Sequence, residues 1–187
     1  MGGGQSTSLA VIDSTKQGVA FTYLKHLWHR NIIRMSPDQK KLYLSIIDLS
    51  PKSMLSFNLP RRINEDSDAP AAKRHSGNGG KFSMLPDGRG IVLQSGQFFQ
   101  ISQNPAADFK PANAVSPHIS LATSINAKYL FVGTEKKEVK VYTYPDLNLE
   151  SSFKLQGIPY RMAYDHSSGL LFCAVSKRIS GLSLIHI

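Results

Sequence analysis

The sequence has little cysteine, little acidic charge and no long apolar run, and each shortage excludes a class of protein. One cysteine, Cys173, in 187 residues cannot form an internal disulfide, which excludes a disulfide-stapled scaffold. No window approaches 18 uninterrupted apolar residues, which excludes a membrane-spanning helix. Hydrophobic residues make up 41% of the chain, which indicates a folded globular protein rather than a disordered one.

The shortage of acidic residues leaves the chain strongly basic. The chain contains 22 Lys and Arg but only 13 Asp and Glu, which gives a formal net charge of +9. The basic residues occur as scattered pairs near predicted turns, a distribution that favours a positively biased surface over a dedicated nucleic-acid site. Nucleic acid is therefore only a weakly supported partner, for which salt-sensitive retention on a polyanion would be the sign.

The first residues, Met-Gly-Gly-Gly-Gln-Ser, match the pattern for myristoylation at Gly2. No polybasic stretch follows, and a glycine-rich flexible start would have the same letters, so no lipid anchor is expected. The start also lacks the basic and apolar regions of a secretory signal. Together with the single cysteine, this favours a cytoplasmic protein.

The last residues, Leu182 to Ile187, resemble a translated sequencing adapter, and residues 181–187 are therefore expected to be an artefactual tail. On this view the natural chain continues beyond the sequence given. The alternative is a genuine final strand from Ile179 to Ile187, which the alternation of apolar and polar residues permits.

Four segments repeat one template: a short apolar strand, a polar turn and a second strand. They cover residues 32–45, 82–93, 119–132 and 162–175. Alignment on Asp38, Asp87, Asn126 and His166 gives steps of 49, 39 and 40 residues, and the two shorter steps lie near the 40–45 residues of a four-stranded propeller blade. The longest step contains residues 61–81, whose polar, Gly- and Pro-containing sequence predicts an inserted loop.

The chemistry of each repeat favours strands over helices. Pro37 and Pro86 preset the first corner of a turn, and aspartates follow them. No window shows a sustained 3.6-residue period, and residues 21–33 are interpreted as strand, loop and strand. In the segment 139–144 alternate side chains are expected on opposite faces: Val139, Val141 and Thr143 on one, and Lys140, Tyr142 and Tyr144 on the other.

These repeats resemble those of β-propellers of the YVTN or WD-like class. The resemblance is carried by Ser36-Pro37-Asp38 with Leu42-Tyr43-Leu44, and by Leu85-Pro86-Asp87-Gly88 with Ile91-Val92-Leu93. It covers residues 21–180 and implies an all-β array of about four antiparallel sheets, or blades, in an incomplete propeller. Residues 1–20 are expected to form a flexible segment or a partial strand of a first blade. No Gly-His pair or Trp-Asp dipeptide is present, which departs from the WD signature.

The sequence contains no complete catalytic or cofactor motif, so no catalytic residue, cofactor or metal site is expected. Three weak patterns resemble functional sites but are better explained by structure. His26 and His29 would share a face only on a helix, where strands are expected; Asn64, Asp66 and Asp68 begin like a calcium loop that fails at Ala69 and His75; and the turn aspartates suit turn geometry. His118 and His166 are expected to be exposed at turns, and Cys173 to be buried in a strand.

The sequence thus predicts a non-enzymatic propeller that serves as a platform for a protein partner, because propeller loops converge on a broad surface. The candidate binding-loop residues are Arg61, Arg62, Lys73 and Arg74. This prediction rests on analogy of fold. The alternative is a piece of a propeller enzyme, lactonase-like or cofactor-dependent, whose catalytic residues are not recognisable in this sequence.

Overall fold

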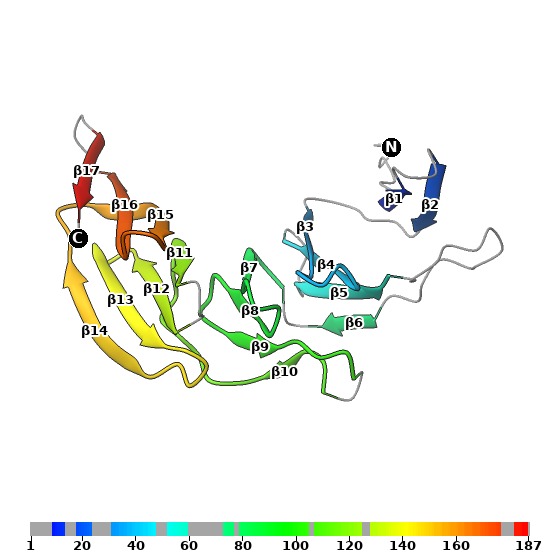
Figure 1. Ribbon diagram of the computed structural model, residues 1–187. Helices are drawn as coiled ribbons and strands as arrows, with labels where there is room; N and C mark the ends of the chain where they lie inside the picture. The colour runs from blue at the N-terminus through cyan, green and yellow to red at the C-terminus, as the bar shows by residue number, and fades with distance from the viewer. Residues whose placement is uncertain are drawn as a thin grey trace, which may run out of the picture. The chain divides into compact units, whose positions relative to one another are not determined.

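The computed structural model describes residues 9–13, 18–23, 31–47, 52–59, 73–76, 79–104, 107–124, 128–176 and 182–186. The chain divides into two compact units, Met1–Lys81 and Phe82–Ile187. Every regular element in the described ranges is a strand, which confirms the all-β class (Figure 1). Over these same ranges, no helix has the length and hydropathy needed to cross a bilayer.

The first unit contains a hairpin and one four-stranded antiparallel sheet. The hairpin pairs β1 (Leu9–Asp13) with β2 (Gly18–Tyr23), so the expected boundary after residue 20 falls inside a strand. The sheet runs in chain order through β3 (Asn31–Met35), β4 (Lys41–Ile46), β5 (Ser53–Asn58) and β6 (Lys73–Ser76). Part of the range predicted as an inserted loop, 61–81, is therefore the fourth strand of this sheet.

The second unit contains three antiparallel sheets, each again in chain order. The first consists of β7 (Phe82–Met84), β8 (Gly90–Leu93), β9 (Phe98–Gln100) and β10 (Lys110–Pro111). The second consists of β11 (Ser120–Thr123), β12 (Tyr129–Thr134), β13 (Glu138–Thr143) and β14 (Leu149–Lys154). The third consists of β15 (Ile158–Asp165), β16 (Leu170–Ser176) and β17 (Leu182–His186). A four-stranded meander in chain order is the arrangement of a propeller blade.

The sequence repeats correspond to the first hairpin of each large sheet: β3–β4, β7–β8, β11–β12 and β15–β16. The backbone N–H of Ser36 donates to the carbonyl of Lys41 at 2.8 Å, and Leu85 and Ser124 make the same five-residue connection. In the fourth hairpin Asp165 and Leu170 are the corresponding pair in the strand register. Equivalent residues are thus 49, 39 and 41 apart, and the alignment on His166 is wrong by one position.

The β11–β14 sheet is covered on both faces within its unit. One face contributes Leu130, Val132 and Tyr142 to a cluster with Leu85 and Phe98 from the β7–β10 sheet. On the other face Val139 packs in a cluster with residues of the β15–β17 sheet. The two faces predicted for residues 139–144 are therefore both present, and a neighbouring sheet packs against each of them, with Lys140 and Thr143 left partly exposed.

The contact between the β11–β14 and β15–β17 sheets depends on a glycine. A Cβ at Gly133 would lie 2.9 Å from Cγ of Pro159 and 3.1 Å from its carbonyl oxygen, so only glycine allows the two backbones to approach this closely. The Ser120 hydroxyl donates to the same Pro159 carbonyl at 2.6 Å. Cys173 lies in the core of this contact, which confirms the prediction that it is buried.

Within the segment predicted to be an artefactual tail, residues Leu182–His186 form strand β17. Its backbone pairs antiparallel with residues 172–176 of β16. An alternating apolar segment will pair with an available strand edge whatever its origin, because the bonds involve only backbone groups. The adapter origin of residues 181–187 therefore stays a prediction.

Candidate functional site

The four residues predicted to bind a partner do not form one described loop. Arg61 and Arg62 lie outside the described residues. Lys73 and Arg74 belong to β6, where they pair with Ser56 and Leu55 of β5. The loop assignment of Lys73 and Arg74 is therefore corrected to a position on the end strand of a sheet.

The turn aspartates make bonds that hold their own turns. The carboxylate of Asp38 accepts a hydrogen bond from the Ser36 hydroxyl at 2.7 Å and another from the backbone N–H of Lys40 at 3.1 Å. The carboxylate of Asp87 likewise accepts from the backbone N–H of Arg89 at 3.0 Å. These are the local bonds that make aspartate favourable in turns, which agrees with the structural interpretation of the repeat.

Asp165 shows the electrostatic consequence of such a turn most clearly. Its carboxylate accepts hydrogen bonds from the hydroxyls of Ser168 and Ser167 and from the backbone N–H of Ser167. These donors, with the Ser168 hydroxyl as the largest contributor, lower the pKa of Asp165 to about 2. Over the described ranges, no three His, Cys, Asp or Glu side chains lie close enough together to hold a metal ion.

Several other residues singled out from the sequence lie outside the described ranges. They are His26, His29, Asn64, Asp66, Asp68 and Asn126. His166 is exposed, as expected, and its ring stands edge-on to Tyr164. His118, by contrast, was predicted to be exposed and is buried, with only 7% of its surface exposed.

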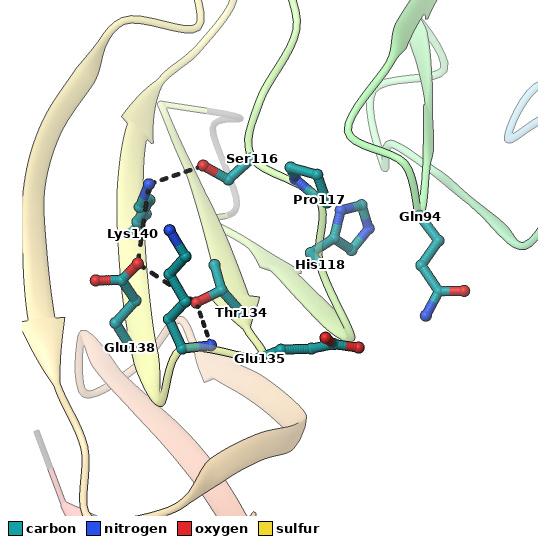
Figure 2. A pocket seen from close by; sticks show the side chains of 9 residues that line it. Gln94, Ser116, Pro117, His118, Thr134, Glu135, Glu138 and Lys140 are labelled. Carbon is teal, nitrogen blue, oxygen red and sulfur yellow. Dashed lines mark hydrogen bonds and ion pairs between the residues drawn. The ribbon is translucent and has the colours of Figure 1, made fainter.

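His118 is buried at the wall of a cleft of about 590 Å³ within the second unit (Figure 2). The loop that carries Ser116, Pro117 and His118 forms one wall, and β12, β13 and the turn between them form the other. The backbone N–H of His118 donates to the carbonyl of Gln94 at 2.9 Å, which holds this loop against the β8–β9 turn. The full lining is Gln94, Ser116, Pro117, His118, Thr134, Glu135, Lys136, Glu138 and Lys140.

A chain of hydrogen bonds crosses one end of the cleft. The Lys140 ammonium donates to the Ser116 hydroxyl at 2.9 Å, and that hydroxyl lies 2.9 Å from the hydroxyl of Tyr142. The Tyr142 hydroxyl also accepts from the backbone N–H of Ser116 at 3.1 Å. In Figure 2 the Lys140 and Ser116 side chains point toward one another, while the His118 ring extends toward Gln94.

Glu138 is held in its charged form at the floor of the cleft. Its carboxylate accepts a hydrogen bond from the Lys154 ammonium at 2.9 Å and lies 3.8 Å from the Lys140 ammonium. The hydrogen bond from Lys154 is the largest influence, and it lowers the pKa of Glu138 against the opposing effect of desolvation. The Ser152 hydroxyl, at 3.4 Å, also favours the charged form.

His118 is held in its neutral form instead. Desolvation by burial lowers the pKa of its imidazole, and a hydrogen bond with the backbone of Ser116 opposes this only partly. Its Nδ1 atom is fully buried and has no hydrogen-bond partner among the described residues. Neither Glu138 nor Lys140 was predicted as a site residue, although two charges alternating with valines in one strand were the available signal of a polar site.

A second cleft, of about 600 Å³, lies beside Tyr144 in the same unit. The Tyr144 ring packs edge-on against Phe98. Burial, followed by a hydrogen bond to the Asp87 carboxylate, raises the pKa of Tyr144 strongly. The Asn113 amide donates to the carbonyl of Asp146 at 2.9 Å, so this cleft is held by contacts between two neighbouring sheets.

The end strand β14 presents the largest exposed apolar side chains of its sheet. Leu149 is 54% exposed and Phe153 is 44% exposed. Glu150 is an extra residue in this strand, because Leu149 pairs with Tyr142 and Ser151 with Val141. In the part of the chain that the structure describes, no strand pairs with the outer edge of β14, so its backbone groups there are open to another chain.

Comparison with known proteins finds a likeness of structure. No family model and no curated protein matches the chain. Among solved structures it is similar to Kuenenia stuttgartiensis hydrazine synthase, with a TM-score of 0.61 over 98% of this chain. The fold is a propeller-like array of antiparallel sheets. The identity is 12% and the match covers 66% of that chain, just under two thirds, so the likeness concerns fold alone.

Proposed function

We propose that the chain is a non-enzymatic propeller-like platform, with repeats of the YVTN or WD-like class, that binds a protein partner through the outer strands of its sheets. The observation that carries this proposal is the open edge of β14 with two large apolar side chains, Leu149 and Phe153, exposed beside it. Exposed apolar side chains beside unpaired backbone groups favour an extended segment of a partner, which adds a strand and packs its side chains at the same place.

Other features of β14 explain why the chain itself can remain soluble. Glu150, Ser151, Ser152 and Lys154 lie between or beside the two apolar residues. Charged side chains and a bulge on an end strand hinder uncontrolled pairing between copies of the same protein. The edge is thus available to a complementary partner while its charges oppose self-association.

Lys73 and Arg74 occupy a comparable place in the first unit, because β6 is also an end strand of a four-stranded sheet. We extend the proposal to these two residues together with Arg61 and Arg62, as basic contacts for the partner. Reversal of all four charges is expected to weaken partner binding at least tenfold. Unchanged binding would remove them from the interface.

The test of the β14 edge places a photo-crosslinking amino acid at Phe153 or Leu149, with Arg89, exposed in the turn between β7 and β8 and on no outer strand, as the control position. We expect both edge positions to give an adduct with one and the same protein, identified by mass spectrometry, and the control to give none. The purified partner should then bind Phe153→Asp at least tenfold more weakly than the unchanged chain. Adducts equal to the control, or binding unaffected by Phe153→Asp and Leu149→Asp, would contradict the proposal.

A further inference from the structure

His118 is a buried titratable side chain that the proposed platform does not use. It is more than nine-tenths buried, and its ring lines the cleft beside Pro117 and Gln94 (Figure 2). Its Nδ1 atom has almost no accessible surface and no hydrogen-bond partner among the described residues. Protonation makes both ring nitrogens donors, so a charged His118 would keep a buried N–H at Nδ1 without an acceptor. The buried position therefore suits the neutral ring alone.

The charged groups around the ring do not favour its protonation. Glutamates and lysines are equal in number in the lining of the cleft, and Glu138 is bound in addition by Lys154 of β14. The β8–β9 turn contributes the neutral Gln94. Burial is the main influence on the pKa of His118 and lowers it, while a hydrogen bond with the backbone of Ser116 opposes it only partly. The titratable groups on the elements packed against this loop are Glu135, Lys136, Glu138, Lys140, Tyr142 and Lys154.

The loop that carries His118 is fixed firmly at its two ends. At one end the Val115 side chain is buried in the apolar cluster between the β7–β10 and β11–β14 sheets, and its backbone N–H donates to the carbonyl of Gly96 at 2.9 Å. At the other end the backbone N–H of Ile119 donates to the carbonyl of Gly133 at 2.8 Å. Residues 116–118 lie between these two anchors, so their displacement leaves the sheets themselves paired.

Between the anchors the loop is held by polar bonds that water can replace. The backbone N–H of His118 donates to the carbonyl of Gln94 at 2.9 Å. The Ser116 hydroxyl accepts from the Lys140 ammonium at 2.9 Å, and the backbone N–H of Ser116 donates to the Tyr142 hydroxyl at 3.1 Å. Exchange of such bonds for bonds to water costs much less than a buried charge without a partner. A protonated His118 is therefore more stable outside the fold than inside it.

We propose that residues 116–118 are a pH-operated wall of the cleft, closed while His118 is neutral and displaced into water when its imidazole is protonated. Displacement solvates the charged ring and breaks the bond to Gln94. It also removes one wall of the cleft, so that the Lys140 ammonium and the Tyr142 hydroxyl come to face water. This device lies apart from the β14 edge, so it stands or falls independently of the proposed platform.

The direction of the response follows from the linkage between protonation and opening. A displaced His118 takes up its proton near the ordinary pKa of about 6.5, whereas the pKa of the buried ring is lowered. The wall is therefore most stable above this value. Its open fraction rises by up to about tenfold for each pH unit below it, until the pKa of the buried ring is reached. Glu138 remains charged over this range, because its own pKa is lowered in the folded chain.

The test measures amide exchange in the full chain by NMR at pH values of about 7.5 and 5.5, corrected for the intrinsic exchange rates. We expect the protection of the Ser116 and His118 amides to fall about fivefold or more on acidification. The amides of Val115 and Ile119, at the anchors, are the matched controls and should keep their protection. Titration of the rings should give His118 a lower pKa than the exposed His166. Equal falls at all four amides, no fall at His118, or equal titration of the two rings would overturn the proposal.

Two histidine variants make the assignment specific. His118→Phe keeps a buried ring without a titrating group, and it is expected to abolish the pH dependence of protection at the Ser116 amide. His166→Phe is the control, because it removes an exposed histidine and should leave that dependence unchanged. Thermal melting establishes that each variant folds, and the four amides of the unchanged chain decide the question if His118→Phe does not. An unaltered pH dependence in folded His118→Phe, or its loss in His166→Phe, would overturn the proposal.

Discussion

Strands β13 and β14 are neighbours of equal length in one sheet, and they differ in almost every other respect. In β13, Val139, Val141 and Tyr142 are buried, and even Glu138 lies beneath other side chains. In β14 no residue is buried. The difference arises because sheets cover both faces of β13, while β14 lies at the end of its own sheet with an open edge.

The comparison separates the part of a blade that stabilises the fold from the part that is free for recognition. A residue on β13 has to suit a packed sheet on each face, so its size and polarity are constrained. A residue on β14 contributes mainly backbone bonds, and its side chain can be selected for another purpose. The four predictions that follow test this division, from the largest expected effect to the smallest.

The same change on the two strands should give very different losses of stability. Val139→Asp places a carboxylate in a closed apolar cluster and is expected to cost about 3–5 kcal/mol of unfolding free energy. Phe153→Asp, on the residue paired with Val139, should cost about 1 kcal/mol. Urea unfolding measures both losses of free energy, and hydrogen exchange of the β12 and β13 amides measures them independently. Similar losses would show that β14 is part of the core.

The close contact at Gly133, between the β11–β14 and β15–β17 sheets, should not tolerate an added methyl group. Gly133→Ala introduces a methyl group beside Pro159 and Ser120, and the overpacking is expected to cost about 1–3 kcal/mol. Ser151→Ala on β14 is the control and should change the unfolding free energy by less than about 0.5 kcal/mol. An unfolding free energy unchanged by Gly133→Ala would mean that the two sheets can move apart without loss of stability.

The ion pair that links the two strands predicts a dependence on pH. Because the pKa of Glu138 is lowered in the folded chain, its contribution is present above the unfolded value of about 4.3 and is lost as pH falls through the folded value. Lys154→Met should raise the pKa of Glu138 toward that value. It should also lower the melting temperature at pH 7 but much less at pH 3. Carboxyl NMR and melting curves measure the two effects, with Lys128→Met as the control. A pKa of Glu138 unmoved by Lys154→Met would contradict the assignment.

The smallest effect is expected for an apolar residue on the outer strand. Leu149→Ala removes a side chain that is mostly in water and should change stability by less than about 0.5 kcal/mol. Leu130→Ala, fully buried on β12, is the reference and should cost about 2–5 kcal/mol. A loss for Leu149 near that of Leu130 would mean that the exposed leucine stabilises the fold rather than a complex.

The same division explains which strands could be predicted from the sequence. The aromatic and aliphatic runs of β4 and β8 reflect burial on both faces, those of β12 and β16 reflect burial of at least every second residue, and the alternation of residues 139–144 anticipated β13. The end strands β6 and β10 lack such an apolar pattern, since their sequences are Lys-Arg-His-Ser and Lys-Pro. They are strands because a neighbour supplies backbone bonds, which leaves no trace in side-chain pattern.

The candidate site was harder to predict for a related reason. Ser116 and Pro117 indicate a turn, and turn residues are usually exposed, so His118 was expected in water. Its burial depends on a bond to Gln94, which belongs to another sheet, and no local pattern reports such a contact. The turn role of Asp38 and Asp87 was predictable because those bonds remain within a few residues.

The extra residue in β14 has a consequence for symmetry. Side chains in a strand alternate between faces, so residues an even number of positions apart would share one face, as Leu149 and Phe153 would in a regular strand. Glu150 shifts this parity, and Leu149 consequently lies opposite Tyr142, on the other face from Phe153. One inserted residue therefore places the two exposed apolar side chains on opposite faces of the sheet. A strand added at this edge would meet one of them on each of its faces.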